Sequence, residues 1–198
     1  MRKILLFLLM FELTMVGWCV AGEYEVGLTV GEHSINGGLQ YKKHTMNGYW
    51  KTGGAALYVD KDNAEYQWLD LDFVVGSETL LPGMGVEVGF KGLLGEVEKF
   101  RSGDVGAIGF TGRVSYTFFR EMTFVPIEIY GGFTYAPEVL SFLDTENVFN
   151  YKLGVAVYVV ENAAIVTEYN AYDIDMNSGG GDWEFSDNEF RFGLKLRF

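Results

Sequence analysis

The sequence predicts an all-β protein, a single closed antiparallel transmembrane β-barrel of 8 to 10 strands that follows a cleaved signal peptide. Three observations predict this fold. Residues 189–198 alternate strictly between apolar side chains and charged residues or glycine, which is typical of a strand between lipid and a polar interior. Residues 1–11 have a basic start followed by an apolar stretch, as secretory signals do. No apolar run after residue 21 approaches the roughly 18 residues that a spanning helix needs.

The N-terminal segment is predicted to be removed. Cys19 and Ala21 place small residues at the two positions that a signal peptidase reads. We therefore predict a signal peptide over 1–21 and an outer-membrane barrel over 22–198. Glu12 interrupts the apolar stretch, so a retained N-terminal anchor is the alternative. The predicted mature chain has no cysteine, and backbone pairing and packing must then supply its stability.

Nine strands can be recognised by alternation, and most of them are as long as the 9 to 11 residues that cross a membrane at a tilt. Two of them, 66–74 and 163–174, alternate less regularly. Single-chain bacterial barrels have an even number of strands. A further strand at 38–42 would bring the number of strands to ten. If 24–30 were not a wall strand, the number would be eight, and we prefer ten. The nine predicted strands are 24–30, 53–60, 66–74, 83–93, 108–118, 125–135, 149–159, 163–174 and 189–198.

The connections between these strands are predicted to alternate between tight and long. Such barrels have short periplasmic turns and longer external loops, which places Phe198 at the periplasmic side. The short connections are 76–82, 120–122 and 161–162, and the longer ones are 60–65, 92–104, 136–147 and 175–188.

Composition supports a membrane barrel and argues against nucleic acid as a partner. The net charge of the chain is −12, whereas nucleic-acid-binding domains carry basic patches. Aromatic residues make up 16% of the chain and 26 residues are glycine, as expected from rings at membrane interfaces and glycines on a crowded wall. The alternative is a soluble barrel of the lipocalin type, which would have its apolar residues inside.

Charged residues at inward positions of the predicted strands balance in sign, six acids against six bases. A barrel of this size has room inside only for side chains or one small ligand, so we predict an ion-pair network that fills the lumen. A narrow hydrophilic passage is the alternative. The twelve residues are Asp70, Asp72, Glu87, Lys91, Arg113, Glu128, Lys152, Glu168, Glu189, Arg191, Lys195 and Arg197.

One segment resembles a calcium-binding loop. Asp173, Asp175, Asn177 and Glu184 occupy relative positions 1, 3, 5 and 12 of the twelve-residue pattern. Ser178 stands where that pattern has glycine, and the flanks are predicted to be strands rather than helices. The alternative is an external loop that is rich in Gly, Asp and Asn because these residues form turns. No other cofactor is expected.

Catalysis is not expected, although some barrels of this size modify lipids. The only histidines are His33 and His44, and Glu32, His33 and Ser34 are adjacent. Adjacent strand residues point to opposite faces, so these three form a triad only if they lie in a loop. A lipid-modifying enzyme and a receptor or adhesin that acts through its loops are the competing functions.

The second half of the chain resembles the YfaZ family of bacterial outer-membrane proteins. The resemblance rests on residues 129–140, which end in Tyr-Ala-Pro-Glu-Val-Leu, and on the spacing of the segments 150–157 and 163–172; it covers 53–198. It implies an outer-membrane barrel without an established biochemical activity, so no site residues are carried over.

The expected protein is thus a non-catalytic integral barrel of the bacterial outer membrane, either structural or a narrow pore with a charge-filled lumen. The expected partners are outer-membrane lipid, lipopolysaccharide and the outer-membrane assembly machinery. That machinery would recognise the C-terminal strand, which ends in the aromatic Phe198. A monomer is expected.

Overall fold

A computed structural model describes residues 22–61, 64–78, 81–99, 101–118, 123–178 and 181–198, so the predicted signal peptide lies outside the described residues. None of the described helices is long and apolar enough to span a membrane. The elements are β1 (Glu23–Gly31), β2 (Ser34–Thr45), β3 (Gly48–Lys61), β4 (Ala64–Ser77), β5 (Met84–Glu98), β6 (Ser102–Phe118), β7 (Ile127–Ala136), η1 (Glu138–Leu140), β8 (Ser141–Leu143), β9 (Thr145–Val160), β10 (Ala163–Ser178) and β11 (Gly181–Arg197).

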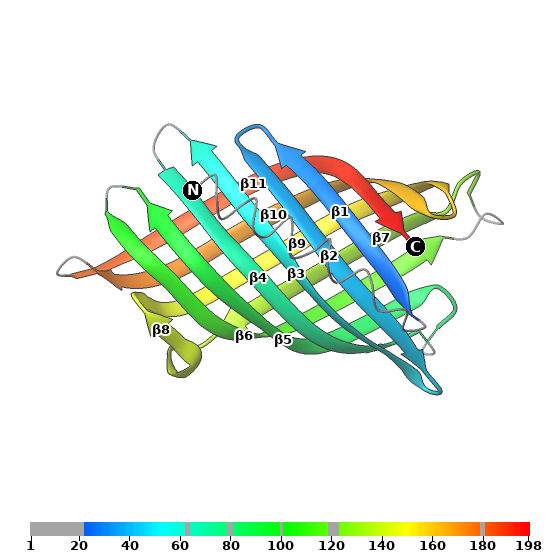
Figure 1. The fold of residues 1–198 in the computed structure, drawn as a ribbon, viewed down its shortest axis with the longest axis horizontal. Coiled ribbons are helices and arrows are strands. Elements are labelled where there is room, and N and C mark those ends of the chain that lie inside the picture. The colour runs from blue at the N-terminus through cyan, green and yellow to red at the C-terminus, as the bar shows by residue number, and fades with distance from the viewer. Residues whose placement is uncertain (1–21, 62–63, 79–80, 100, 119–122, 179–180) are drawn as a thin grey trace.

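The strands close into one antiparallel barrel, which confirms the predicted fold class (Figure 1). Consecutive strands pair around the wall, β5 pairs with β6, and β1 pairs with β11 to complete the ring. The seam between β1 and β11 extends to the chain end, where Tyr24 and Phe198 exchange two backbone hydrogen bonds of 3.1 and 2.9 Å. This seam pairs the first wall strand with the last, as β-structure in lipid requires.

Within the described residues the wall has ten positions, and the eleventh strand, β8, shares one of them with β7. Proline has no N–H to donate to a ladder, and β7 ends just before Pro137. The short helical turn η1 follows, and β8 then resumes pairing with β6 at Val105, Gly106 and Ala107. The interruption therefore does not open the wall.

The tenth strand is β2, which settles the choice between eight and ten. It is longer than the predicted 38–42 and pairs with both β1 and β3 over nearly its whole length. Its sequence has adjacent glycines, Gly37 and Gly38, and adjacent lysines, Lys42 and Lys43. These pairs hide the alternation by which the other strands are recognised.

The prediction of long external loops is wrong, because most of those residues are in strands. β5 continues to Glu98 and β6 begins at Ser102, while β10 continues to Ser178 and β11 begins at Gly181. Pairing within each hairpin satisfies backbone groups that a loop would leave to water. The asymmetry lies in strand length: the long hairpins project at the end opposite the C-terminus (Figure 1).

Along these hairpins the polarity of the two faces inverts. Near the chain end of β11, Phe190, Phe192 and Leu194 point outward and are 61, 59 and 56% exposed. Toward the hairpin tip, Trp183 and Phe185 of the same strand point inward and are buried. The wall is therefore apolar outside in one half of the barrel and apolar inside in the other.

The inward apolar residues form one buried core at the hairpin end, which we call the apolar plug. Its members come from eight of the ten wall positions, all except the shorter β1 and β2. They are Leu57, Val59, Tyr66, Trp68, Leu93, Val97, Val105, Ala107, Ala136, Val148, Tyr172, Ile174, Met176, Trp183 and Phe185.

Candidate functional site

The polar interior lies between the apolar plug and the end of the barrel where β1 begins and β11 ends. The structure places all twelve charged residues of the predicted network on inward positions, and most of them form ion pairs. Five pairs involve only predicted residues: Lys91 with Asp70 at 3.2 Å, Arg113 with Glu128 at 2.9 Å, Arg197 with Glu128 at 3.9 Å, Lys152 with Glu168 at 3.6 Å and Arg191 with Glu189 at 3.2 Å.

Two members of the network were missed by the sequence reasoning. Glu25 on β1 lies 3.1 Å from Lys195 and 2.9 Å from Arg197 on β11, so it bridges the closing seam. Its alternation with Val26 and Leu28 is a signal that would have identified it. Lys51 lies 2.8 Å from Glu87 and was missed because β3 starts earlier than the predicted 53. Adding one acid and one base keeps the lumen balanced.

Tyrosine hydroxyls complete the carboxylate partners. Tyr130 donates a hydrogen bond to Glu168 at 2.5 Å, and Tyr158 donates one to Glu128 at 2.7 Å. Tyr49 likewise donates to Glu87, at 2.8 Å. A carboxylate can accept several hydrogen bonds, so each of these acids is held by a cation and a phenol together.

Several charges in the network are only partly compensated, and two of them, Asp72 and Lys152, line the inner cavity described below. Asp72 forms no ion pair among the described contacts: its Oδ2 accepts one long hydrogen bond of 3.5 Å from Gln40, and its buried Oδ1 has no partner. The Lys152 ammonium lies 3.6 Å from Glu168, which is an ion pair but exceeds hydrogen-bonding distance. The Asp72 Oδ2 atom and the Lys152 ammonium therefore retain hydrogen-bonding capacity.

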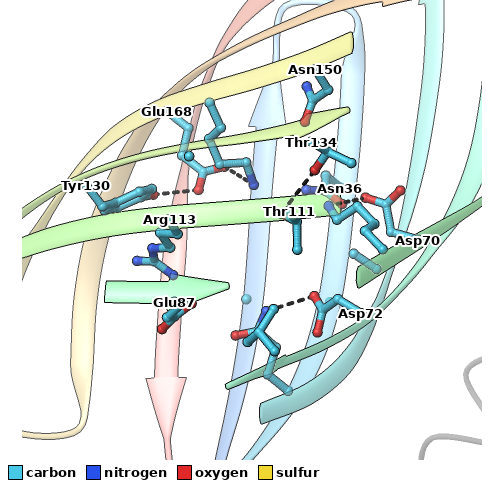
Figure 2. A pocket seen from close by; sticks show the side chains of 18 of the residues that line it. Asn36, Asp70, Asp72, Glu87, Thr111, Arg113, Tyr130, Thr134, Asn150 and Glu168 are labelled. Carbon is cyan, nitrogen blue, oxygen red and sulfur yellow. Dashed lines mark hydrogen bonds and ion pairs between the residues drawn. The ribbon is translucent and has the colours of Figure 1, made fainter. Parts of the chain in front are cut away.

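Two joined cavities occupy the polar interior. The inner one, of about 200 Å³, has both Asp72 and Lys152 in its wall, with Glu168 and Asp72 on opposite sides in Figure 2. The outer one, of about 710 Å³, lies toward the end where β1 begins and β11 ends. Glu25, Gln40, Lys51, Glu87, Arg113 and Lys195 line both cavities.

The apolar plug closes the inner cavity at the hairpin end. Leu57 and Tyr172 belong to the plug and also line that cavity. Trp68 on β4 contacts Tyr172 on β10 with ring centroids 4.7 Å apart. β4 and β10 are five positions apart in either direction around the ten-position wall, so this contact joins opposite walls. The polar interior is thus a blind chamber.

The predicted calcium-loop residues lie on strands instead of in a loop. Asp173, Asp175 and Asn177 are on the outer face of β10, and Glu184 pairs with Asp175 from β11. The neighbouring Asp173 raises the pKa of the Glu184 carboxyl. No group of three or more His, Cys, Asp or Glu residues in the described part of the chain is arranged to hold a metal ion. Calcium binding stays a prediction.

The residues considered for catalysis lie at the β1–β2 turn. His33 pairs with Glu32 at 3.7 Å, whereas the Ser34 hydroxyl accepts a hydrogen bond of 3.2 Å from Arg191. No Ser34–His33 hydrogen bond occurs among the described contacts. At the other chain end, the Phe198 side chain is 72% exposed and available to a partner.

These features define a class: a closed antiparallel β-barrel with an apolar outer belt and a charge-paired interior. Comparison with solved structures finds bacterial outer-membrane barrels of low similarity. OmpT of Vibrio cholerae is 12% identical, with a TM-score of 0.41 over 83% of this chain and 56% of that one, so this chain spans about half of its length. The NanC porin is 11% identical (TM-score 0.34; 89% and 99% covered), and CarO of Acinetobacter baumannii 12% (TM-score 0.33; 89% and 97%).

At these TM-scores the likenesses support no functional argument. No protein-family model matches the sequence, and no curated protein matches it.

Proposed function

We propose that this chain is an integral β-barrel protein of the bacterial outer membrane, non-catalytic and of YfaZ type, whose lumen is closed to conduction. The observation that carries the proposal is the inversion of polarity along the same strands. An apolar outer face suits the half of the wall that lies in lipid, and an apolar inner face suits a half that projects into water.

The outer belt supports the membrane assignment. Monomeric soluble proteins rarely expose contiguous apolar patches larger than a few hundred Å², whereas here large apolar side chains are exposed on every wall strand except β3. The soluble lipocalin-like alternative requires the reverse facing. It agrees only with the hairpin half of the barrel.

The apolar plug supports a closed lumen rather than a narrow pore. Ile174, Met176 and Phe185 at its centre are fully buried, and an ion that crossed it would lose its hydration without any polar replacement. The charge-paired interior then serves to rigidify the barrel around the two cavities. Partly buried ion pairs of this kind need their partners, since an unpaired buried charge is costly.

The proposed orientation places the chain ends in the periplasm and the long hairpins outside. The partners would be outer-membrane lipid at the belt and lipopolysaccharide around the hairpins. The assembly machinery would bind the C-terminal strand through Phe198. The protein is proposed to be a monomer.

Planar-bilayer recording of purified, refolded protein tests the closed lumen. We expect no discrete conductance steps from the wild type, and discrete steps from a variant that combines Trp68→Ala with Tyr172→Ala. Trp50→Ala is the matched control, because Trp50 lies on the outer face, where it stacks on Phe73. Discrete channels from the wild type would refute the closed lumen.

The membrane assignment has a separate test. The mature chain should require detergent for solubility and should change its gel migration on heating, as closed barrels do when they unfold. A mature chain that stays monomeric and soluble without detergent would show the assignment to be wrong.

A further inference from the structure

The inner cavity is open because several wall residues that line it have small side chains or none. Gly27, Gly38 and Ala55 contribute to its lining. A Cβ atom added at Gly27 would meet no atom within 4 Å, so this glycine faces open space. Interiors of folded proteins are otherwise close-packed, and a void lined by polar groups is a place for a ligand or for water.

Opposite charges with unused hydrogen-bonding capacity lie across this cavity. Asp72 has no ion-pair partner among the described contacts, and its Oδ2 accepts only one long hydrogen bond of 3.5 Å, from Gln40. Lys152 has ammonium donors that do not reach Glu168 at 3.6 Å. A partly buried carboxylate with so few donors is costly, and a ligand ammonium group at Oδ2 would compensate its charge.

Neutral polar side chains surround the two charges. Asn36 and Gln40 lie in the same lining as Asp72, and Thr134 and Asn150 in the same lining as Lys152. Figure 2 shows Thr134 next to Thr111 and Asn36, with Asn150 farther from Asp72. These groups can accept from or donate to the ends of a polar ligand, which would fix its orientation.

We propose that the inner cavity binds a small zwitterionic amino-carboxylate. Its ammonium group pairs with Asp72 and its carboxylate group with Lys152. Binding is reversible and involves no covalent step. A ligand with both charges leaves the chamber electrically balanced, whereas a lone cation or anion satisfies only one of the two open groups.

The cavity volume limits the ligand to a short chain. Since one water occupies roughly 30 Å³ of liquid, a cavity of about 200 Å³ has room for about six or seven groups of that size. Amino acids with two to four carbons fit this limit.

Saturation-transfer NMR on the refolded full barrel in detergent tests the proposal, with glycine, β-alanine and 4-aminobutyrate as probes. We expect at least one probe to bind about tenfold more tightly than butylammonium or butyrate, which carry one charge each. Asp72→Asn and Lys152→Met should each weaken binding by about tenfold or more. Equal binding of the zwitterion and the singly charged compounds would overturn the proposal, as would the absence of any binding.

A pair of leucine substitutions separates filling of the cavity from general damage. Gly27→Leu places a side chain in the open space and should abolish binding. Gly37→Leu adds the same side chain on the outer face of the neighbouring strand, where the nearest atom to an added Cβ is Leu28 Cδ1 at 3.9 Å, and should leave binding unchanged. Heat-dependent gel migration verifies that every variant is folded. Binding that survives Gly27→Leu in a folded barrel would contradict the assigned site.

The test does not depend on conductance or on orientation. Binding in detergent would stand even if bilayer recordings showed channels. Conversely, a closed lumen that bound none of the probes would leave the proposed function intact and remove only this inference.

Discussion

Replacing Gly193 with alanine should weaken the seam that closes the barrel. Gly193 on β11 faces Thr29 on β1 within the paired stretch that joins the two ends of the wall. A Cβ atom built at Gly193 lies 2.0 Å from the Leu28 carbonyl oxygen and 2.6 Å from the Thr29 Cα. Both are backbone atoms, so no side-chain rotation can relieve the overlap, and glycine is required by close backbone approach.

The size of the effect follows from these distances. Real Cβ contacts essentially never fall below 3.0 Å, so β1 and β11 must separate locally by about 1 Å. A hydrogen bond of about 2.9 Å would then lengthen beyond its useful range. Loss of about two ladder bonds, each contributing about 1 kcal/mol, adds to about 1–3 kcal/mol for overpacking. We expect the free energy of unfolding to fall by about 3–5 kcal/mol.

Denaturant unfolding of the refolded barrel in detergent, followed by heat-dependent gel migration and tryptophan fluorescence, measures this change. Gly27→Ala is the matched control, because the same added methyl group meets open space on the neighbouring strand. It should stay within about 0.5 kcal/mol of the wild type. A Gly193→Ala barrel as stable as the Gly27→Ala barrel would refute the reasoning from backbone overlap.

Three further predictions concern charge and assembly. Glu25→Gln removes the carboxylate that pairs with both Lys195 and Arg197 at the seam. It should lower the free energy of unfolding in denaturant by about 2 kcal/mol, between the values for exposed and buried pairs. A smaller loss than that caused by Lys42→Gln, which breaks a more exposed pair, would contradict this. Asp173→Asn should lower the pKa of the Glu184 carboxyl toward its ordinary value, because Asp173 raises it. In the wild type the folded state binds the Glu184 proton more tightly than the unfolded chain does, so the contribution of Glu184 to stability is lost as pH rises above the ordinary pKa of a glutamate. Carboxyl-carbon NMR of Glu184 across roughly pH 3 to 7 measures the effect of Asp173→Asn. An unchanged titration of Glu184 in this variant would refute the prediction. Phe198→Ala should slow insertion by the assembly machinery while leaving spontaneous folding in detergent nearly unchanged, because the ring is exposed; equal slowing of both rates would argue against a recognition role.

Much of the wall could be predicted from alternation, and its exceptions have one physical cause. The strands with clean alternation, such as 149–159 and 189–198, lie where the two faces have constant polarity. The segments 66–74 and 163–174 alternate less regularly because the apolar residues change face within them. In β4, Trp68 points inward into the plug while Phe73 points outward into the belt.

The sequence predicted that charged side chains line the interior, but it did not predict which of them pair. Inward charges such as Lys91 and Glu168 follow from the two-residue period of a strand. Which acid meets which base depends on strand stagger and wall curvature, so the pairing of Glu25 with Lys195 and Arg197 across the seam has no signal in the local sequence. The unpaired state of Asp72 is likewise a property of the closed barrel.

By itself, the sequence determined an all-β chain with one apolar and one polar face on most strands, because a strand exposes alternate residues to its two sides. The tertiary structure decided which end of the barrel is open. Trp68 and Tyr172 lie far apart in the chain and meet only because closure places β4 opposite β10. Closure also turned the inward charges into a blind chamber, since contact between opposite walls is a property of the whole ring and of no single strand.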